Sequence, residues 1–289
     1  MLIIGLVVNI LTLPETNAAV LLRQRAQALS SHTGQVYRSK LEVEQGKKPL
    51  SVILKVSLSR PWDLLFREPI VLLLTLYLSI IYGILYLLFA AYPIVYQKAR
   101  GWSESKTGLA FIGILVGIVF SVIATYPMYL AYRKKTMALG RLAPEARLPD
   151  SFYGAIALPV GLFWFAWTNS PSVHWMASIA AGVPFGFGMV MVFLPVLNYL
   201  VDSYTIYAAS ALAANSSIRS VFGAVFPLVA GPMYDRLGIH WASSLIAFLA
   251  VACVPLPFVF YRYGAAIRRK CRYAAESEKL MEALFGVAK

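Results

Sequence analysis

The chain has 289 residues, of which 59% are hydrophobic and 13% charged, and its mean hydropathy is +0.68. Soluble domains carry about 25% charged residues, so this composition excludes a soluble protein and indicates an integral membrane protein. The formal net charge of +13 does not indicate a nucleic-acid partner, because the basic residues lie in short segments between apolar runs, where membrane topology explains them.

The N-terminal part of the sequence predicts two segments. Residues 1–13 are apolar but shorter than the roughly 20 residues of a membrane-spanning helix. They lack the basic region and cleavage site of a signal peptide, so we interpret them as the end of a truncated transmembrane helix. Residues 14–68 contain nine Lys and Arg and are predicted to form a cytoplasmic loop. Within it, Val52–Phe66 is amphipathic and is expected to lie on the membrane surface.

Six apolar runs follow, and each is long enough to cross about 30 Å of hydrocarbon as a helix. They are approximately Ile70–Tyr96, Leu109–Tyr132, Phe152–Asn169, Trp175–Leu200, Ala208–Met233 and Trp241–Tyr263. No strand-like alternation competes with this interpretation. The sequence therefore predicts an all-α membrane helix bundle of six full transmembrane helices, residues 69–263, plus a partial one at the N-terminus.

The basic residues of the connecting segments predict the orientation. Alternate sides of the bundle carry 21 and 4 Lys and Arg. By the positive-inside rule, both ends of the six-span block are cytoplasmic, and residues 264–289 form a basic cytoplasmic tail. The loop Val201–Tyr207 fits this rule least well, because it should be cytoplasmic but its charged residue is Asp202.

Arg219 lies in the middle of the run Ala208–Met233, where a charge costs about 3 kcal/mol. This run is rich in Ala, Ser and Gly, which let helices approach closely, so Arg219 is expected to face the bundle interior or a water-filled cavity. None of the 13 acidic residues lies deep in a predicted span. Its expected partners are carbonyls, hydroxyls, Asn198 or Asn215, or an acid elsewhere. Two roles stay open: a hub of interhelical hydrogen bonds, and direct participation in transport.

Two further groups of intramembrane residues allow alternative interpretations. The first-span tyrosines either line a cavity for a cationic or aromatic substrate, or form an interfacial belt. The Gly- and Pro-rich stretch from Gly182 to Pro195 forms either a moving transporter helix or a kinked packing helix. We assign substrate binding to Tyr77, Tyr82, Tyr86, Asn198, Asn215 and Arg219, and helix packing or gating to Gly182, Pro184, Gly186, Gly188, Pro195, Asp202 and Pro227.

The sequence contains no pattern typical of an enzyme. It shows no metal-ligand cluster, no nucleophile–base arrangement and no phosphate-binding glycine loop. We therefore expect neither catalysis nor a cofactor.

Five segments together resemble the major facilitator superfamily, and in particular the fungal drug:proton antiporter branch with twelve spans, which includes multidrug, cycloheximide and polyamine exporters. The segments are "LPETNAAVLLRQRA", "RPWDLLFREPIVLLLTLYLSIIYGILYLLF", "PEARLPDSFYGAIALPVGLFWFAWTNSPSVHW", "YLVDSYTIYAASALAANSSIRSVFGAVFPLVAGPMYDRLGIHWASSL" and "PLPFVFYRYGAAIRRKCRYA". They cover the chain from Pro14 to about Ala275. The resemblance implies two six-helix halves around a central cavity, of which this sequence is the C-terminal one.

The resemblance also carries functional expectations. It implies proton-coupled export of small drug-like or polyamine molecules by alternating access, with the antiporter motif and coupling acids in the half that this sequence lacks. Arg219 then follows the Ala-Ala-Asn of the family's eleventh helix. With Asn215, one turn earlier, it is expected to organise packing near the cytoplasmic side of the cavity.

The expected partners are the lipid bilayer, a small-molecule substrate, and either a missing N-terminal half or a second copy of the chain. A non-transporting truncated product is the alternative function. The plasma membrane is the expected location, with the vacuolar membrane as the alternative.

Overall fold

The computed structural model describes residues 12, 14–15, 18–39, 43, 49–139 and 143–286. The chain divides into two units, residues 1–58 and 59–289. The first unit contains α2 (Ala18–Thr33) and the first half of α4 (Leu50–Arg67). The membrane-helix end predicted at residues 1–13 falls outside the described residues except for Thr12.

The second unit is an all-α bundle, and no strand occurs among the residues that the structure describes. This confirms the predicted fold class. Its elements in chain order are the end of α4, α5 (Pro69–Tyr92), the π-helix η1 (Pro93–Lys98), α6 (Glu104–Leu109), α7 (Ile112–Leu139), the 3₁₀ turn η2 (Pro144–Arg147), α8 (Pro149–Thr168), α9 (Trp175–Ala180), α10 (Gly182–Ser203), the 3₁₀ turn η3 (Thr205–Tyr207), α11 (Ala208–Cys253), α12 (Pro255–Lys270) and α13 (Arg272–Gly286).

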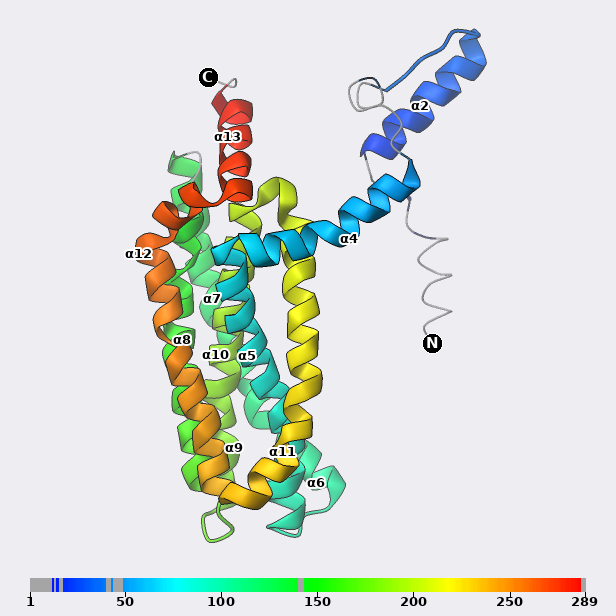
Figure 1. Cartoon of the computed structure of the whole chain (residues 1–289). Coiled ribbons are helices and arrows are strands. Elements are labelled where there is room, and N and C mark those ends of the chain that lie inside the picture. Colours follow the sequence, from blue (N-terminus) through cyan, green and yellow to red (C-terminus); the bar gives the residue numbers. More distant parts are fainter. Residues whose placement is uncertain are drawn as a thin grey trace. The chain divides into compact units, whose positions relative to one another are not determined.

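Five continuous helical stretches of this unit are long and apolar enough to cross a membrane: Pro69–Lys98, Glu104–Ala138, Pro149–Thr168, Trp175–Ser203 and Thr205–Lys270. The last has 66 residues and would be about 99 Å long if straight, roughly three times the hydrocarbon thickness. The chain instead reverses direction at Gly238 and runs back as the second part of α11 and then as α12 (Figure 1). This stretch therefore holds two spans, and the bundle has the six that the sequence predicts.

Gly238 makes this reversal possible because its backbone has φ 70° and ψ 169°, a region that is open essentially to glycine alone. The predicted seven-residue connection between Met233 and Trp241 is thus helical on both sides of a single non-helical residue. The sequence does indicate a turn here, because Gly238 is the one glycine between Met233 and Trp241.

Gly238→Ala is expected to lower the free energy of unfolding by about 1–3 kcal/mol, because a Cβ strains this backbone conformation even though no neighbour lies within 4 Å of it. Gly231→Ala is the matched control: Gly231 also has open space around it but lies within the helical part of α11, so alanine there costs nothing. Tryptophan-fluorescence melting of the two variants in detergent checks this, and equal melting temperatures would contradict it.

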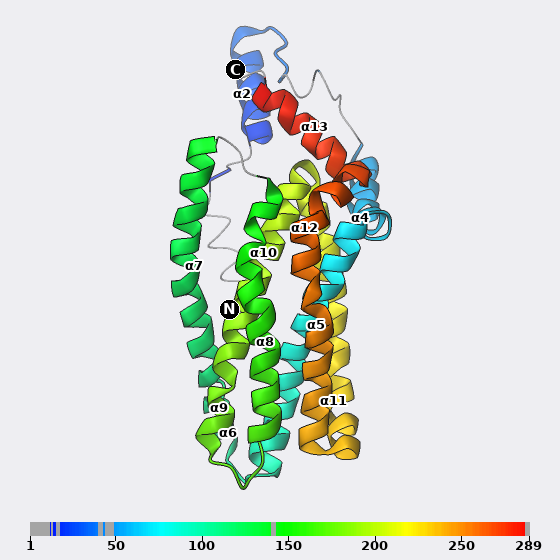
Figure 2. The same cartoon turned by 90° about the vertical axis from the view of Figure 1, so that its left-hand side faces the viewer.

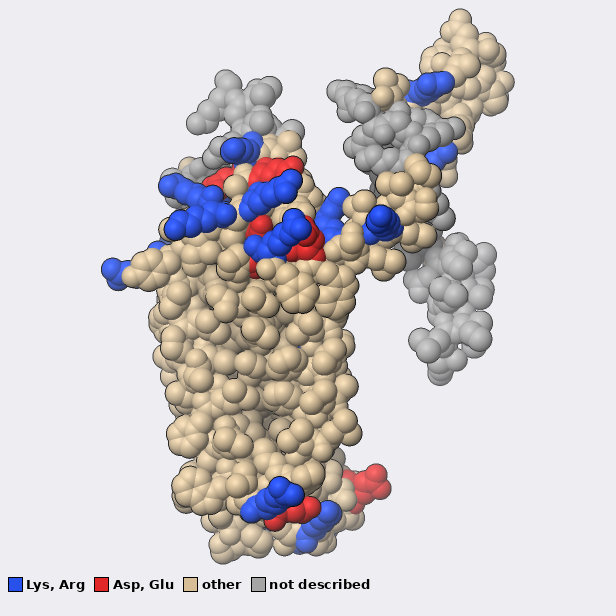
Figure 3. Space-filling view, in the orientation of Figure 1, with Lys and Arg blue, Asp and Glu red and all other residues tan. Residues whose placement is uncertain are grey.

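The charged residues of the bundle gather at its two ends. Figure 3 shows an uncharged band between them, with most Lys and Arg at the end where α12 meets α13. Figure 2 shows the long helices running along one another across this band. This is the charge asymmetry from which the positive-inside rule predicts a cytoplasmic side.

The predicted boundary between loop and bundle at residue 68 stays a prediction, and the two compact units meet within α4. The second unit begins at Ser59, so the end of α4 belongs to the bundle. Leu64 and Leu65 are almost fully buried, at 0% and 2% exposed, and this burial fastens the end of α4 to the bundle. At the other end, α12 continues to Lys270, past the predicted end of the last span at Tyr263.

Glycines bring α10 into close contact with two neighbouring helices. A Cβ on Gly186 would overlap the carbonyl oxygen of Ile114 in α7. On another side of α10, a Cβ on Gly188 would lie 2.7 Å from the backbone nitrogen of Leu158 in α8. Small residues at such contacts let helix backbones approach and pack by van der Waals contact in lipid. Gly182 also lies against α7, with Ile114 as its nearest neighbour.

Candidate functional site

Arg219 is the twelfth residue of α11 and lies about 17 Å from the start of that helix, near mid-depth of the span. Its guanidinium carbon lies 4.9 Å from the ring centre of Tyr82 and 5.8 Å from that of Phe193. None of the ion pairs among the described residues includes Arg219. A cation–π contact contributes about 0.5–2 kcal/mol, which offsets part of the roughly 3 kcal/mol cost of the charge.

The aromatic rings at Arg219 form a connected group on α5 and α10. The Tyr82 hydroxyl donates a hydrogen bond of 3.0 Å to the Tyr86 hydroxyl, and the two ring centres are 4.7 Å apart. The Tyr82 ring also lies 6.5 Å from the ring of Phe193. We call Tyr82, Tyr86, Phe193 and Arg219 the Arg219 cluster.

Gly223 lets α11 receive the Tyr82 ring. It lies one turn after Arg219, and a Cβ there would stand 2.9 Å from Cε1 of Tyr82. The absence of a side chain on Gly223 thus leaves room for the Tyr82 ring against α11. Phe193 was not predicted as a site residue. Its position on the Gly- and Pro-rich helix is the feature of the sequence that could have indicated it.

Asn215 lies one turn before Arg219, as predicted, but it is only 1% exposed. Its Nδ2 atom has no hydrogen-bond partner in the described part of the chain, and neither does Nε of Arg219. Tyr77 makes none of the ring contacts of the cluster and is buried in the bundle core at 2% exposed. Five residues turn a helix by about 140°, so Tyr77 and Tyr82 lie on different faces of α5.

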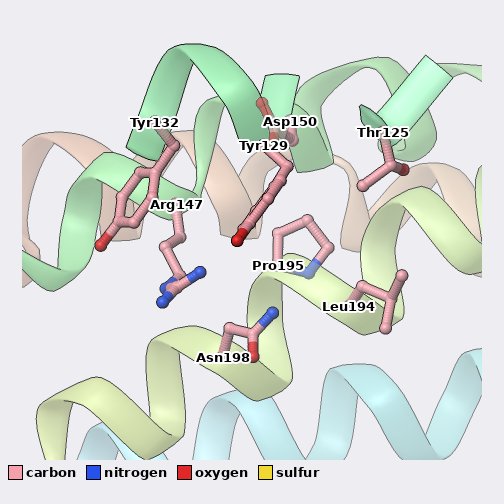
Figure 4. Close-up of a pocket in the computed structure, with 8 residues that line it drawn as sticks. All are labelled: Thr125, Tyr129, Tyr132, Arg147, Asp150, Leu194, Pro195 and Asn198. Atoms are coloured by element: carbon pink, nitrogen blue, oxygen red, sulfur yellow. The ribbon is translucent and has the colours of Figure 1, made fainter. Parts of the chain in front are cut away.

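A second feature is a small pocket between α7, α8 and α10 at the more basic end of the bundle (Figure 4). Figure 4 shows Tyr129, Pro195 and Asn198 at its middle, with Tyr132 and Arg147 at one end. Its volume is about 90 Å³, whereas pockets for drug-sized ligands hold roughly 300–1,000 Å³. This pocket is therefore too small for such a ligand, and Asn198 lies apart from the Arg219 cluster.

The predicted gating residue Asp202 fastens the connection between α7 and α8 to α10. Its Oδ2 accepts a hydrogen bond of 2.5 Å from Nε of Arg147, whose guanidinium lies 4.4 Å from the ring centre of Tyr132. Pro184 lies in the first turn of α10, where its missing N–H costs little. Pro195 and Pro227 lie inside α10 and α11, where each removes a backbone hydrogen bond.

The sequence matches the family model described as "Major Facilitator Superfamily" over residues 1–227. The chain belongs to the major facilitator superfamily. The family consists of transporters and not of enzymes, and the chain is an integral, multi-pass membrane protein with the fold of one half of a major facilitator transporter.

Its relatives include fungal efflux proteins. The chain is 58% identical to the "Major facilitator superfamily multidrug transporter mdrA" of Aspergillus fumigatus over 94% of its own length and 45% of that protein. It is 56% identical to the "MFS-type efflux pump MFS2" of Trichophyton rubrum (96% and 47%). It is 44% identical to the "Citrinin biosynthesis cluster MFS transporter mrr1" of Monascus ruber (93% and 54%). The chain thus spans about half the length of the curated relatives it matches.

This major facilitator half also contains a buried ionic network that the sequence reasoning missed. Arg268 of α12 is 6% exposed and holds both carboxylate oxygens of the equally buried Glu145, at 3.3 and 3.4 Å. Arg268 also pairs with Glu278 of α13 at 3.3 Å. The 123 positions that separate Arg268 from Glu145 leave no local signal of this pairing. The feature of the sequence that could have indicated a buried acid is the acidic residue next to a proline shortly before a predicted span, in Pro144-Glu145.

Glu68 forms a second buried group of hydrogen bonds in this half. It is 1% exposed and accepts hydrogen bonds from the Tyr204 hydroxyl at 2.9 Å and from the backbone N–H of Tyr273 at 3.0 Å. Tyr273 in turn donates to Asp63 of α4 at 2.5 Å. The start of α5, the end of α10 and the start of α13 are thus joined at the more basic end of the bundle.

Cys271 is expected to resist alkylation in the folded protein. It is 4% exposed, and burial, together with the nearby Glu68 carboxylate, raises the pKa of its thiol to about 12. At pH 7.5 the reactive thiolate is then only about one part in ten thousand or less. In the Cys253→Ser variant, which leaves Cys271 as the one cysteine of the chain, maleimide labelling should be negligible until denaturant is added. Complete labelling of the folded variant would contradict this.

Proposed function

We propose that the chain is the C-terminal half of a secondary exporter of small amphipathic molecules. The observation that carries this proposal is Arg219, a cation near mid-depth of a span that no acid pairs among the described residues. Intramembrane ionisable residues are retained where they serve a transport pathway, because their insertion is costly. The efflux function in the names of the relatives supports the same conclusion.

The proposed mechanism is alternating access, in which two six-helix halves rock about a site near the midplane. In this mechanism the Arg219 cluster belongs to the substrate site, and the glycine contacts of α10 with α7 and α8 keep this half together as it moves. The proposed second half is an N-terminal six-helix half, and a second copy of this chain is the alternative. Coupling to protons and a plasma-membrane location are proposed from the resemblance to the drug:proton antiporter branch.

Arg219→Ala is expected to lower export by about tenfold or more when this chain is expressed with its N-terminal half, because the cluster loses its charge and its cation–π contacts. Arg236→Ala is the control, since Arg236 is exposed and lies two residues before the turn at Gly238. Both variants are compared by dye efflux at matched amounts of protein in the membrane. Near-wild-type efflux from both would contradict the role of Arg219.

A further inference from the structure

We propose that the Arg219 cluster selects organic anions: a substrate carboxylate binds the Arg219 guanidinium, and the apolar part of the substrate packs on the neighbouring aromatic rings. This inference rests on the proposed function, since it names the class of molecule that the exporter carries.

The charge balance of α11 favours an anionic ligand. The cluster contains one full positive charge, and none of the described ion pairs supplies a negative one. Ring quadrupoles attract the guanidinium but leave its net charge unchanged. An anionic ligand gains from this uncompensated charge in a region of low dielectric, whereas a cationic ligand is repelled by it.

The ring faces of the Arg219 cluster already bind a cation of the protein itself. Tyrosines in a membrane cavity allow a site for cationic substrates, but here the Tyr82 ring already holds the guanidinium at 4.9 Å and Phe193 holds it at 5.8 Å. A polyamine or another cation would have to displace Arg219 from these rings. The protein's own cation thus occupies the feature that would otherwise bind a foreign one.

The hydrogen-bond donors of the Arg219 cluster suit a carboxylate. The Tyr82 hydroxyl donates to Tyr86, so the hydrogen of the Tyr86 hydroxyl remains available for an acceptor. The guanidinium offers several N–H donors, and its Nε is buried without a partner in the described part of the chain. Arg and Tyr donors match a carboxylate, which only accepts hydrogen bonds.

Asn215 supports the same site from the same face of α11. Its amide is 1% exposed, and its Nδ2 donor has no partner among the described residues. Asn215 and Arg219 are one turn apart, so this face of α11 presents hydrogen-bond donors that have no acceptor among the described residues.

The test uses three fluorescent probes that differ in charge: dansylglycine (a carboxylate), dansylglycinamide (neutral) and dansylcadaverine (a cation). Efflux of each is measured from cells that express the complete two-half exporter, either wild-type or with Arg219→Gln, Arg219→Lys or Arg236→Gln. We expect the wild-type protein to export dansylglycine. Arg219→Gln should lower that export by about tenfold or more without lowering dansylcadaverine export, because the change removes a charge that repels cations.

Arg219→Lys and one further variant, Tyr86→Phe, complete the design. Arg219→Lys keeps the charge and should retain part of the dansylglycine export. Tyr86→Phe removes one hydroxyl without a large change in packing, and should lower dansylglycine export alone by about threefold or more. It keeps the proposal testable if Arg219→Gln fails to reach the membrane. Arg236→Gln should leave all three rates unchanged.

The outcomes separate this inference from the proposed function. If the wild-type exporter carries the cation or the neutral probe but not dansylglycine, the proposed function holds and the anion site is wrong. If Arg219→Gln lowers all three rates alike, Arg219 pairs with a carboxylate of the protein's other half and not with a substrate. If no probe is exported, both proposals fail.

Discussion

Arg268→Ala is expected to lower the free energy of unfolding by about 3–5 kcal/mol, because it leaves the buried Glu145 carboxylate without its partner. The same change releases Glu278, so α13 should also separate from the bundle. Melting in detergent should show a decrease on the order of 10 °C. Protease digestion should cut α13 of the variant at lower enzyme concentrations than the wild-type protein requires.

Arg269→Ala is the matched control for this change. Arg269 is the next residue along α12 and carries the same charge, but it is exposed. Its removal should change the free energy of unfolding by less than about 0.5 kcal/mol, as for other surface substitutions. Equal destabilisation by the two changes would show that helix charge, and not the buried pair, is responsible.

Gly186→Leu is expected to prevent normal packing of α10 against α7. The first side-chain atom alone would overlap the carbonyl oxygen of Ile114, and this neighbour is backbone and cannot turn aside. We expect a loss of about 3 kcal/mol or more, since overpacking forces backbones apart. Size-exclusion chromatography of a fluorescent-protein fusion should show aggregate in place of the monodisperse peak.

The control for this packing prediction is Gly108→Leu. Gly108 lies in α6, and a Cβ there would meet nothing within 4 Å. This variant should elute as the wild-type protein does. A monodisperse Gly186→Leu variant with a wild-type melting temperature would contradict the close α7–α10 contact.

The membrane spans were predictable because each is a long apolar run bounded by charged or proline-rich segments. The observed ends of the helices differ most from the predicted ends of the spans where a helix continues beyond the hydrocarbon. An example is α12, which continues to Lys270. Hydropathy marks the part of a helix that lies in lipid and carries no signal for the part that extends into water. The same limit explains why the end of α4 was assigned to the loop although Leu64 and Leu65 pack in the bundle.

The candidate site was predictable in part. The cost of a charge in lipid marked Arg219 from the sequence, and its spacing to Asn215 placed both on one face of α11. The contact of Arg219 with Tyr82 and Phe193 depends on how three helices pack, and a single sequence does not encode this locally. For the same reason, the Arg268–Glu145 pair was missed, although both residues are charged and lie beside predicted spans.

The most direct test of the central claim, that this chain is one half of a two-half exporter, is efflux of the three dansyl probes from cells that express it in two forms. One form is the 289-residue chain alone, and the other is the same chain preceded by the N-terminal half of the Aspergillus fumigatus relative. An antibody against residues 268–289 matches the amounts in the membrane. The account predicts export only from the joined form. Equal export from the chain alone would contradict it.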